Sequence, residues 1–103
     1  MRKVPALPIP VRRALATLGS DVSAARKRRG LTLAAMAERV FATRQTIARI
    51  ERGDAGVAIG TYATALFVLG LLHRLQEVAA PAADQLGMDL DHEKLPRRVR
   101  TKR

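Results

Sequence analysis

The structural interpretation of this chain depends most on the segment TRQTIARIERG, from Thr43 to Gly53. Threonine is among the residue types that cap helix N-termini, and glycine is the type that most often ends a helix. Ile47 and Ile50 share one face of a helix with about 3.6 residues per turn. The segment therefore predicts a short amphipathic helix with both isoleucines buried and a polar face exposed.

The polar face of this helix carries side chains that suit the base edges of a DNA major groove. Arg44, Gln45 and Arg49 fall on the side opposite the isoleucines. Arginine can bond bidentately to guanine O6 and N7, and glutamine can do the same to adenine N6 and N7. We therefore expect these three side chains to contact bases. A solvated polar helix face is the alternative.

Phosphate contacts are expected at both ends of the same helix. Thr43 caps the helix while the first backbone N–H groups can bind a phosphate oxygen, and Thr46 lies in the same first turn. Arg52 lies at the far end, where a phosphate is the better placed partner. Thr43, Thr46 and Arg52 are therefore the predicted phosphate contacts.

A second short helix precedes this segment. Thr32 is a good N-cap for a helix over residues 33–40, and Phe41 and Ala42 connect it to the helix that follows Thr43. Two short helices joined by a tight turn make a helix-turn-helix pattern. Apolar residues at helical spacing predict further helices at 11–29, 59–69 and 71–79. No strand pattern stands out, so the expected fold class is all-α.

Composition divides the chain into three parts. Residues 1–10 contain three prolines and are expected to form a flexible, extended arm. Residues 11–80 hold the helical patterns and are expected to form the helix-turn-helix domain with a dimerisation surface. Residues 81–103 have few large apolar side chains and end in a run of cations, so we expect a weakly structured basic tail.

The charge of the chain favours a polyanionic partner. Lys and Arg total 19 against nine Asp and Glu, which gives a formal net charge of +10. An excess of this size on a small domain repels itself and attracts nucleic acid. Solubility alone is the alternative explanation.

Enzymatic and metal chemistry lack the residues that they need. The chain has no cysteine and only two histidines, His73 and His92, and no acidic cluster surrounds them at metal spacing. No nucleophile with a neighbouring base stands out. We expect no catalytic site, no metal and no cofactor. The longest apolar run, residues 63–72, is far shorter than the roughly 20 residues that cross a bilayer, so we expect a cytoplasmic, nucleoid-associated protein.

Three segments of the chain resemble the lambda-repressor-like, or XRE, helix-turn-helix family. They read RKRRGLTLAAMAERV, TRQTIARIERG and TYATALFVLGL. The resemblance implies a compact five-helix DNA-binding domain in which Arg44, Gln45 and Arg49 read bases. It also implies a structural ion pair between Arg26 on the first helix and Glu51 of the IERG element.

Two residues depart from the pattern of that family. Leu33 stands where the family commonly has a glutamine that touches phosphate, so this contact is absent. Phe41 stands in the turn, where the family favours glycine. A phenylalanine does not easily adopt a positive φ. We therefore expect a turn of different shape, with the Phe41 ring inserted into the core.

A narrower resemblance concerns the small antitoxins of HipBA-type systems. It rests on Phe41, on the continuation ERGDAGVAIGTYATALFVLGL and on the LPRRVR ending. It implies a homodimer that binds its own double-stranded DNA operator, represses its operon and inactivates a HipA-like kinase toxin. The leucines expected at the dimer interface are Leu69, Leu72 and Leu75.

Two other interpretations remain open from the sequence. One is a free-standing XRE-family regulator without a toxin partner. The other is a basic interaction module that binds RNA or protein. The module predicts no operator footprint and little loss on changing Arg44 or Gln45.

Overall fold

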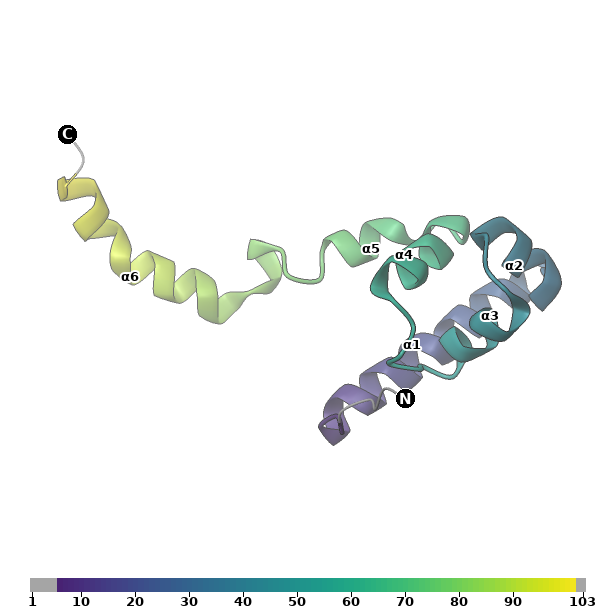
Figure 1. Cartoon of the computed structure of the whole chain (residues 1–103). Coiled ribbons are helices and arrows are strands. Elements are labelled where there is room, and N and C mark those ends of the chain that lie inside the picture. The colour runs from purple at the N-terminus through teal and green to yellow at the C-terminus, as the bar shows by residue number, and fades with distance from the viewer. Residues whose placement is uncertain (1–5, 102–103) are drawn as a thin grey trace. The chain divides into compact units, whose positions relative to one another are not determined.

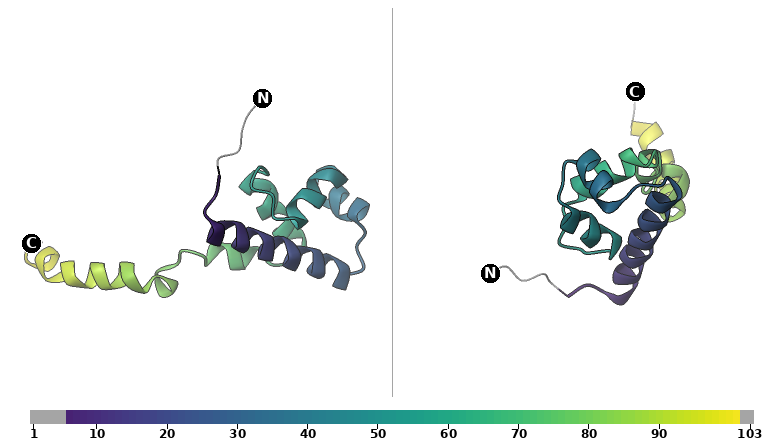
Figure 2. Two further views of the ribbon diagram at one scale, coloured as in Figure 1. Left: turned by 90° about the horizontal axis from the view of Figure 1, so that it is seen from below. Right: turned by 90° about the vertical axis from the view of Figure 1, so that its right-hand side faces the viewer.

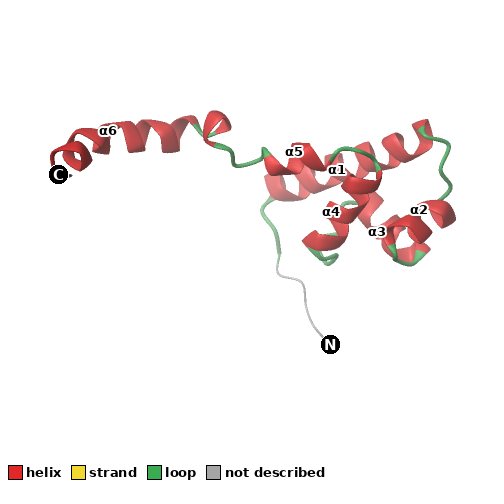
Figure 3. Ribbon diagram, turned by 90° about the horizontal axis from the view of Figure 1, so that it is seen from above, coloured by secondary structure: helices red, strands yellow, loops and turns green. Residues whose placement is uncertain are grey.

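The fold is known from a computed structural model that describes the backbone of residues 6–101 and the side chains of residues 6–94. The described residues form helices and loops without a strand (Figure 3), which confirms the all-α expectation. The chain divides into two units, Met1–Leu72 and His73–Arg103. The helices are α1 (Ile9–Arg28), α2 (Leu33–Val40), α3 (Arg44–Glu51), α4 (Ile59–Val68), α5 (Leu72–Gln76), the short 3-10 helix η1 (Pro81–Ala83) and α6 (Gln85–Thr101).

The first unit is built around α3. This helix contacts both α1 and α2, and α2 also contacts α4. In Figures 1 and 2, α1 runs along one side of the unit while α2 and α3 lie together beside it. Ile47 and Ile50 of α3 are fully buried, as is Met36 of α2. The predicted inward face of α3 is therefore confirmed, and its burial fixes which side of the helix faces solvent.

The crossing of α1 and α3 depends on a glycine. A Cβ atom on Gly19 would lie 2.6 Å from both the Gly53 nitrogen and the Ile50 carbonyl oxygen. Those are backbone atoms, which cannot move aside as a flexible side chain can. Gly53 itself has a φ of +74° and ends α3, as its residue type predicted. Two glycines thus allow α1 to approach the C-terminal end of α3 at backbone distance.

Two threonines begin the helices of the helix-turn-helix unit. The Thr32 hydroxyl accepts a hydrogen bond of 3.0 Å from the Ala35 N–H, and α2 follows it. The Thr43 hydroxyl accepts one of 3.1 Å from the Thr46 N–H, and α3 follows it. Both bonds satisfy N–H groups that lack a partner within their helix. The two predicted N-caps are confirmed.

The turn between α2 and α3 corrects the expectation for Phe41. Its φ is +61° and its ψ is +44°, and its ring is 93% exposed rather than buried. The Phe41 N–H bonds to the Glu38 carbonyl at 3.3 Å, and the Ala42 N–H bonds to the Ala37 carbonyl at 2.9 Å. These two hydrogen bonds end α2, and they form together only when the residue at the position of Phe41 has a left-handed backbone. The hydrogen bonds that end α2 therefore require a left-handed residue at this position, and Phe41 adopts that conformation where the family favours glycine.

The second unit also differs from the expectation of a weakly structured tail. Within it η1 contacts α6, and α6 is helical from Gln85 onward. Asp84 initiates this helix, since its carboxylate accepts a bond of 3.1 Å from the Gly87 N–H. Gln85 donates one of 2.8 Å to Asp89 one turn later. Local capping and side-chain pairing therefore produce a helix where the sequence lacks a core. The side chains of the terminal cations lie outside the described residues.

The arm and the fifth helix also have bounds that differ from those expected. α1 begins at Ile9 with Pro10 in its first turn, a position where proline is favoured, so the expected extended arm ends two residues early. Residues 1–5 lie outside the described residues. α5 covers Leu72–Gln76, which is shorter than the predicted range 71–79.

Candidate nucleic-acid interface

The exposed face of α3 begins at its N-terminal turn. Arg44 and Gln45 are the first two residues of the helix, and both side chains are exposed. Their direction follows from the buried isoleucines on the other face and from the cap at Thr43, which fixes where the helix starts. The turn of α3 that enters a groove first in helix-turn-helix proteins thus carries one arginine and one glutamine.

Arg49 lies one turn further along α3 and is held by Asp54. Its Nε atom donates to Asp54 Oδ2 at 2.9 Å, and both side chains are about one third exposed, 36% and 32%. The hydrogen bond with Asp54 raises the pKa of Arg49. In turn, the bond from Arg49 and then the bond from the Gly56 N–H lower the pKa of Asp54. Arg49, the third residue expected to contact bases, is therefore held in place by Asp54, whereas Arg44 and Gln45 are exposed.

The structure brings Arg26 and Glu51 together in a buried ion pair. Arg26 Nε lies 2.6 Å from Glu51 Oε2, and Nη2 lies 3.1 Å from Oε1. The third donor, Nη1, bonds to the Leu31 carbonyl at 2.7 Å, just after α1 ends. The bond to Glu51 raises the pKa of Arg26. One guanidinium thus fixes α1, the C-terminal turn of α3 and the connection to α2 with respect to one another.

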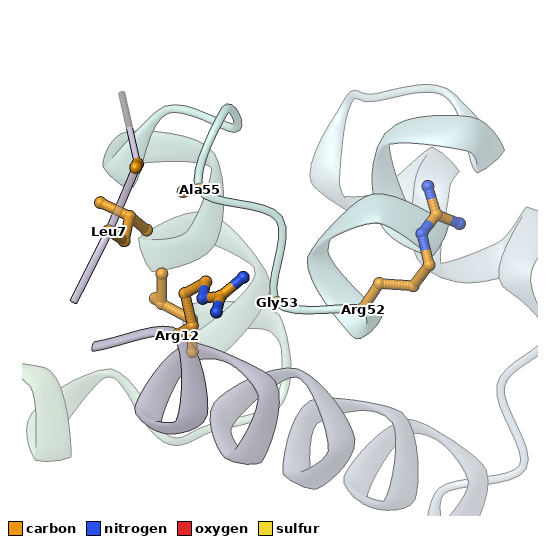
Figure 4. A pocket seen from close by; sticks show the side chains of 7 residues that line it. Leu7, Arg12, Arg52, Gly53 and Ala55 are labelled. Carbon is orange, nitrogen blue, oxygen red and sulfur yellow. The ribbon is translucent and has the colours of Figure 1, made fainter. Parts of the chain in front are cut away.

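The expected phosphate contacts lie at the two ends of α3. Thr43 donates its hydroxyl hydrogen to the Thr46 hydroxyl at 3.0 Å while it caps the helix. This leaves the Thr46 hydroxyl hydrogen as the donor of this pair that can point outward. Arg52 is exposed at the C-terminal end, and Figure 4 shows its guanidinium extended away from Gly53 and Ala55. Both ends of the helix therefore present donors that a phosphate oxygen can accept.

The leucines expected at a dimer interface lie in different environments. Leu69 is 2% exposed and belongs to the core, so its side chain is not available to a partner. Leu72 and Leu75 are half-buried. The large apolar side chains that α4 exposes are Ile59 at 74% and Phe67 at 67%, and neither is among the leucines predicted at the interface.

Sequence reasoning also missed the polar contacts that fix the loop after α3. The Tyr62 hydroxyl on α4 donates to the Asp54 carbonyl oxygen at 2.6 Å. Burial, followed by the nearby Asp54 charge, raises the pKa of Tyr62. Outside this loop, Arg29 at the C-terminal end of α1 donates to the Leu69 carbonyl oxygen at 2.9 Å. The DAG tripeptide signals another contact of this loop, the bond of 2.7 Å that the Asp54 carboxylate accepts from the Gly56 N–H, because aspartate commonly bonds the backbone two residues on.

A cavity of about 470 Å³ lies beside the N-terminal end of α1. Figure 4 shows the Arg12 side chain directed into it between Leu7 and the Gly53–Ala55 loop. Its lining contains no acid, histidine or hydroxyl group that could act in catalysis. Among the described residues no group of three or more acidic, histidine or cysteine side chains could hold a metal ion. No helix of the described part is long and apolar enough to span a bilayer.

Comparison with known proteins agrees with this geometry. A family model described as a helix-turn-helix domain matches residues 17–93, which is more than half of the chain. No curated protein and no solved structure matches the chain. The matched residues contain α2, the turn at Phe41 and α3 with its exposed arginine and glutamine. Helix-turn-helix domains bind DNA with the second helix of the pair. The chain therefore belongs to the helix-turn-helix domain family, and its general role is that of a DNA-binding regulator.

Proposed function

We propose that this protein is a sequence-specific repressor that inserts α3 into the major groove of its operator. The observation that carries the proposal is the exposure of Arg44 and Gln45 on the capped first turn of a helix whose other face is buried. Arg49 adds a third donor one turn further along. These are the side chains that pair bidentately with guanine and adenine. The net charge of +10 supplies the attraction to phosphate that brings the helix to the groove.

Replacing Arg44 tests this proposal. An operator is first selected from a pool of random duplexes, and binding of Arg44→Ala to it is then measured by titration. We expect a loss of about 1–3 kcal/mol and a relaxed preference at one base pair in each half-site. Arg13→Ala, the same change on α1, is the control and is expected to weaken all duplexes alike. Unchanged affinity and unchanged base preference in Arg44→Ala would show that the reading face is wrongly assigned.

We also propose that two chains bind the operator as a homodimer. Ile59 and Phe67 are eight residues apart on α4, a spacing that falls within one stripe of a helix, and both are exposed. They supply apolar surface that the first unit does not bury, and half-buried Leu72 of the same unit remains a candidate for this contact. Half-buried Leu75 belongs to the second unit and stays a separate prediction. A two-fold dimer of this family places its recognition helices roughly 34–36 Å apart, one turn of DNA.

Sedimentation equilibrium tests the dimer. Phe67→Glu places a charge in the proposed apolar contact and is expected to give monomers at concentrations where the wild-type chain is dimeric. Phe41→Glu is the control, because it makes the same change at an exposed phenylalanine outside α4. A Phe67→Glu dimer as stable as the wild-type dimer would place the interface elsewhere.

The finer proposal is that the repressor acts in the cytoplasm as the antitoxin of a HipBA-type pair. Its support is the resemblance of the segments around Phe41 and after Glu51 to those antitoxins. In this role the protein neutralises a HipA-like kinase and represses its own operon. Co-expression with an adjacent kinase-like reading frame tests it: we expect the two proteins to co-purify and the kinase to lose its toxicity. A regulator without a toxin partner predicts an operator footprint but no such complex, and an RNA- or protein-binding module predicts neither.

A further inference from the structure

The loop after α3 holds one side chain of the proposed reading face in place. Asp54 Oδ2 accepts a hydrogen bond of 2.9 Å from Arg49 Nε, and Asp54 Oδ1 accepts one of 2.7 Å from the Gly56 N–H. The Asp54 carbonyl oxygen accepts one of 2.6 Å from the Tyr62 hydroxyl on α4. The carboxylate is thus fixed by its own turn, and the turn is fixed to a core helix.

The same loop lies directly against the guanidinium. A Cβ atom on Gly56 would be 2.9 Å from Arg49 Nη2 and 3.1 Å from Asp54 Oδ1. The absence of a side chain at Gly56 therefore leaves the space that the Arg49 guanidinium occupies. We call Asp54 and Gly56 together the Arg49 seat.

The Arg49 seat leaves the Nη donors of the Arg49 guanidinium free to bind a base. A guanidinium carries five N–H donors in a rigid plane, and the bond to Asp54 uses the one on Nε. The Nη donors remain, and two of them match the O6 and N7 acceptors of guanine in the major groove. A side chain that is already ordered loses less rotamer freedom on binding than a loose arginine does.

We propose that Asp54 is a positioning residue that presents Arg49 to a guanine and so sets the base preference of the protein at that pair. The inference rests on the proposed function and deepens it, because it assigns the base class that Arg49 reads and the residue that enforces the choice. Asp54 acts through Arg49 and does not itself contact the base. Adenine presents an N–H donor where guanine has O6, so the fixed donors of Arg49 discriminate between the two.

A merely structural pair makes a different prediction. If Asp54 only ties down the loop, its replacement lowers stability and leaves base preference unchanged. If Asp54 only adds a negative charge near DNA, its replacement raises affinity for every duplex alike. A positioning role lowers discrimination at one base pair in each half-site, at the position that Arg49→Ala also affects.

The experiment uses the full chain and the selected operator, with every base substituted at each half-site position. Asp54→Asn keeps an oxygen for the Gly56 N–H and removes the charge that holds Arg49. Gly56→Ala keeps all charges and displaces the Arg49 guanidinium. We expect both variants to reduce the preference for guanine at one shared position by about tenfold, within the range of one bidentate pair. In a chain that already carries Arg49→Ala, Asp54→Asn is expected to cause no further change in base preference at that position.

Controls separate the possible failures. Asp21→Asn, the same charge change at an exposed site on α1, is expected to leave the preference intact. Urea unfolding of each variant identifies a loss that comes from folding alone. A wild-type chain that binds all duplexes alike would overturn the proposed function, and the Arg49 seat with it. A wild-type chain that reads its operator while Asp54→Asn and Gly56→Ala retain the full guanine preference would overturn the Arg49 seat alone.

Discussion

Phe41 shows how a single residue can take a backbone geometry that its side chain disfavours. Its left-handed conformation is one that β-carbon sterics make costly for a residue other than glycine. Its ring is 93% exposed, so packing does not repay this cost. The two hydrogen bonds that close α2 impose the geometry on whichever residue occupies the turn. The sequence suggested a turn of different shape with a buried ring, because a phenylalanine does not easily adopt a positive φ.

Replacing Phe41 by glycine is therefore expected to stabilise the protein. Relief of left-handed strain contributes about 1–2 kcal/mol, and the greater freedom of glycine in the unfolded chain offsets part of it. The expected net gain in the free energy of unfolding is about 0.5–1 kcal/mol, measured by urea titration. Ala14→Gly, at an exposed position inside α1 and away from the proposed dimer contact, is the control and should destabilise by about 0.5–1 kcal/mol. A loss of more than about 2 kcal/mol in Phe41→Gly would indicate a buried ring, because that is a typical cost of losing core packing.

The ion pair between Arg26 and Glu51 is the second prediction at this scale. Both side chains are nearly buried, at 9% and 11% exposure. Glu51→Ala leaves the guanidinium without its carboxylate and is expected to lower the free energy of unfolding by about 3 kcal/mol. The double variant Arg26→Met with Glu51→Leu removes both charges and should be less damaging than Glu51→Ala alone. Equal stability of Glu51→Ala and the wild-type chain would show that the pair does not orient the helices.

At the scale of elements, the separation of α1 and α3 is set by Gly19. Substitution by alanine adds a methyl group where backbone atoms of α3 lie 2.6 Å away. The helices must separate, and overpacking of this kind costs about 1–3 kcal/mol. Gly60→Ala is the matched control, since Gly60 is also helical and its added methyl group meets nothing within 4 Å beyond its chain neighbours and its own helix backbone. It is expected to gain about 0.5–1 kcal/mol from helix propensity. Thermal unfolding of the two variants should therefore shift in opposite directions.

Local signals predicted the elements of the helix-turn-helix unit well. The caps Thr32 and Thr43, the buried Ile47 and Ile50 and the bounds of the second helix each depend on residues within one or two turns. The missed features depend on distant or competing interactions. Gly19 meets residues more than thirty positions away, and no helical pattern reports such an approach. The helix α6 is an exception, because its cap at Asp84 is local; it was missed because its described side chains, residues 85–94, bury little.

The candidate site divides in the same way. Exposure of Arg44 and Gln45 follows from helical periodicity, which is readable in the sequence. The pairing of Arg49 with Asp54 does not follow from helical periodicity. Asp54 lies beyond the end of α3, in a loop whose course is fixed by Tyr62 of α4. Leu69 was predicted at a dimer interface but lies in the core, because apolar residues at helical spacing do not by themselves distinguish a side that faces the core from one that faces a partner.

At the scale of the whole molecule, charge determines how strongly DNA is held. With a net charge of +10, binding releases counterions from the phosphates and weakens as salt concentration rises. Arg52→Ala removes one exposed cation at the end of α3 and is expected to reduce the slope of log affinity against log salt by about one. The affinity loss should be the same for operator and random duplexes. A loss confined to the operator would make Arg52 a base-reading residue instead.

Methylation interference on the selected operator tests most directly whether the exposed face of α3 reads bases in the major groove. Guanine N7 lies in that groove and is an acceptor for the arginines of α3, whereas adenine N3 lies in the minor groove. We predict that N7 methylation blocks binding at guanines in two half-sites about 10 base pairs apart, and that Arg44→Ala abolishes the effect at one guanine of each half-site. Interference only at adenine N3, or a pattern identical in Arg44→Ala and the wild-type chain, would contradict the account.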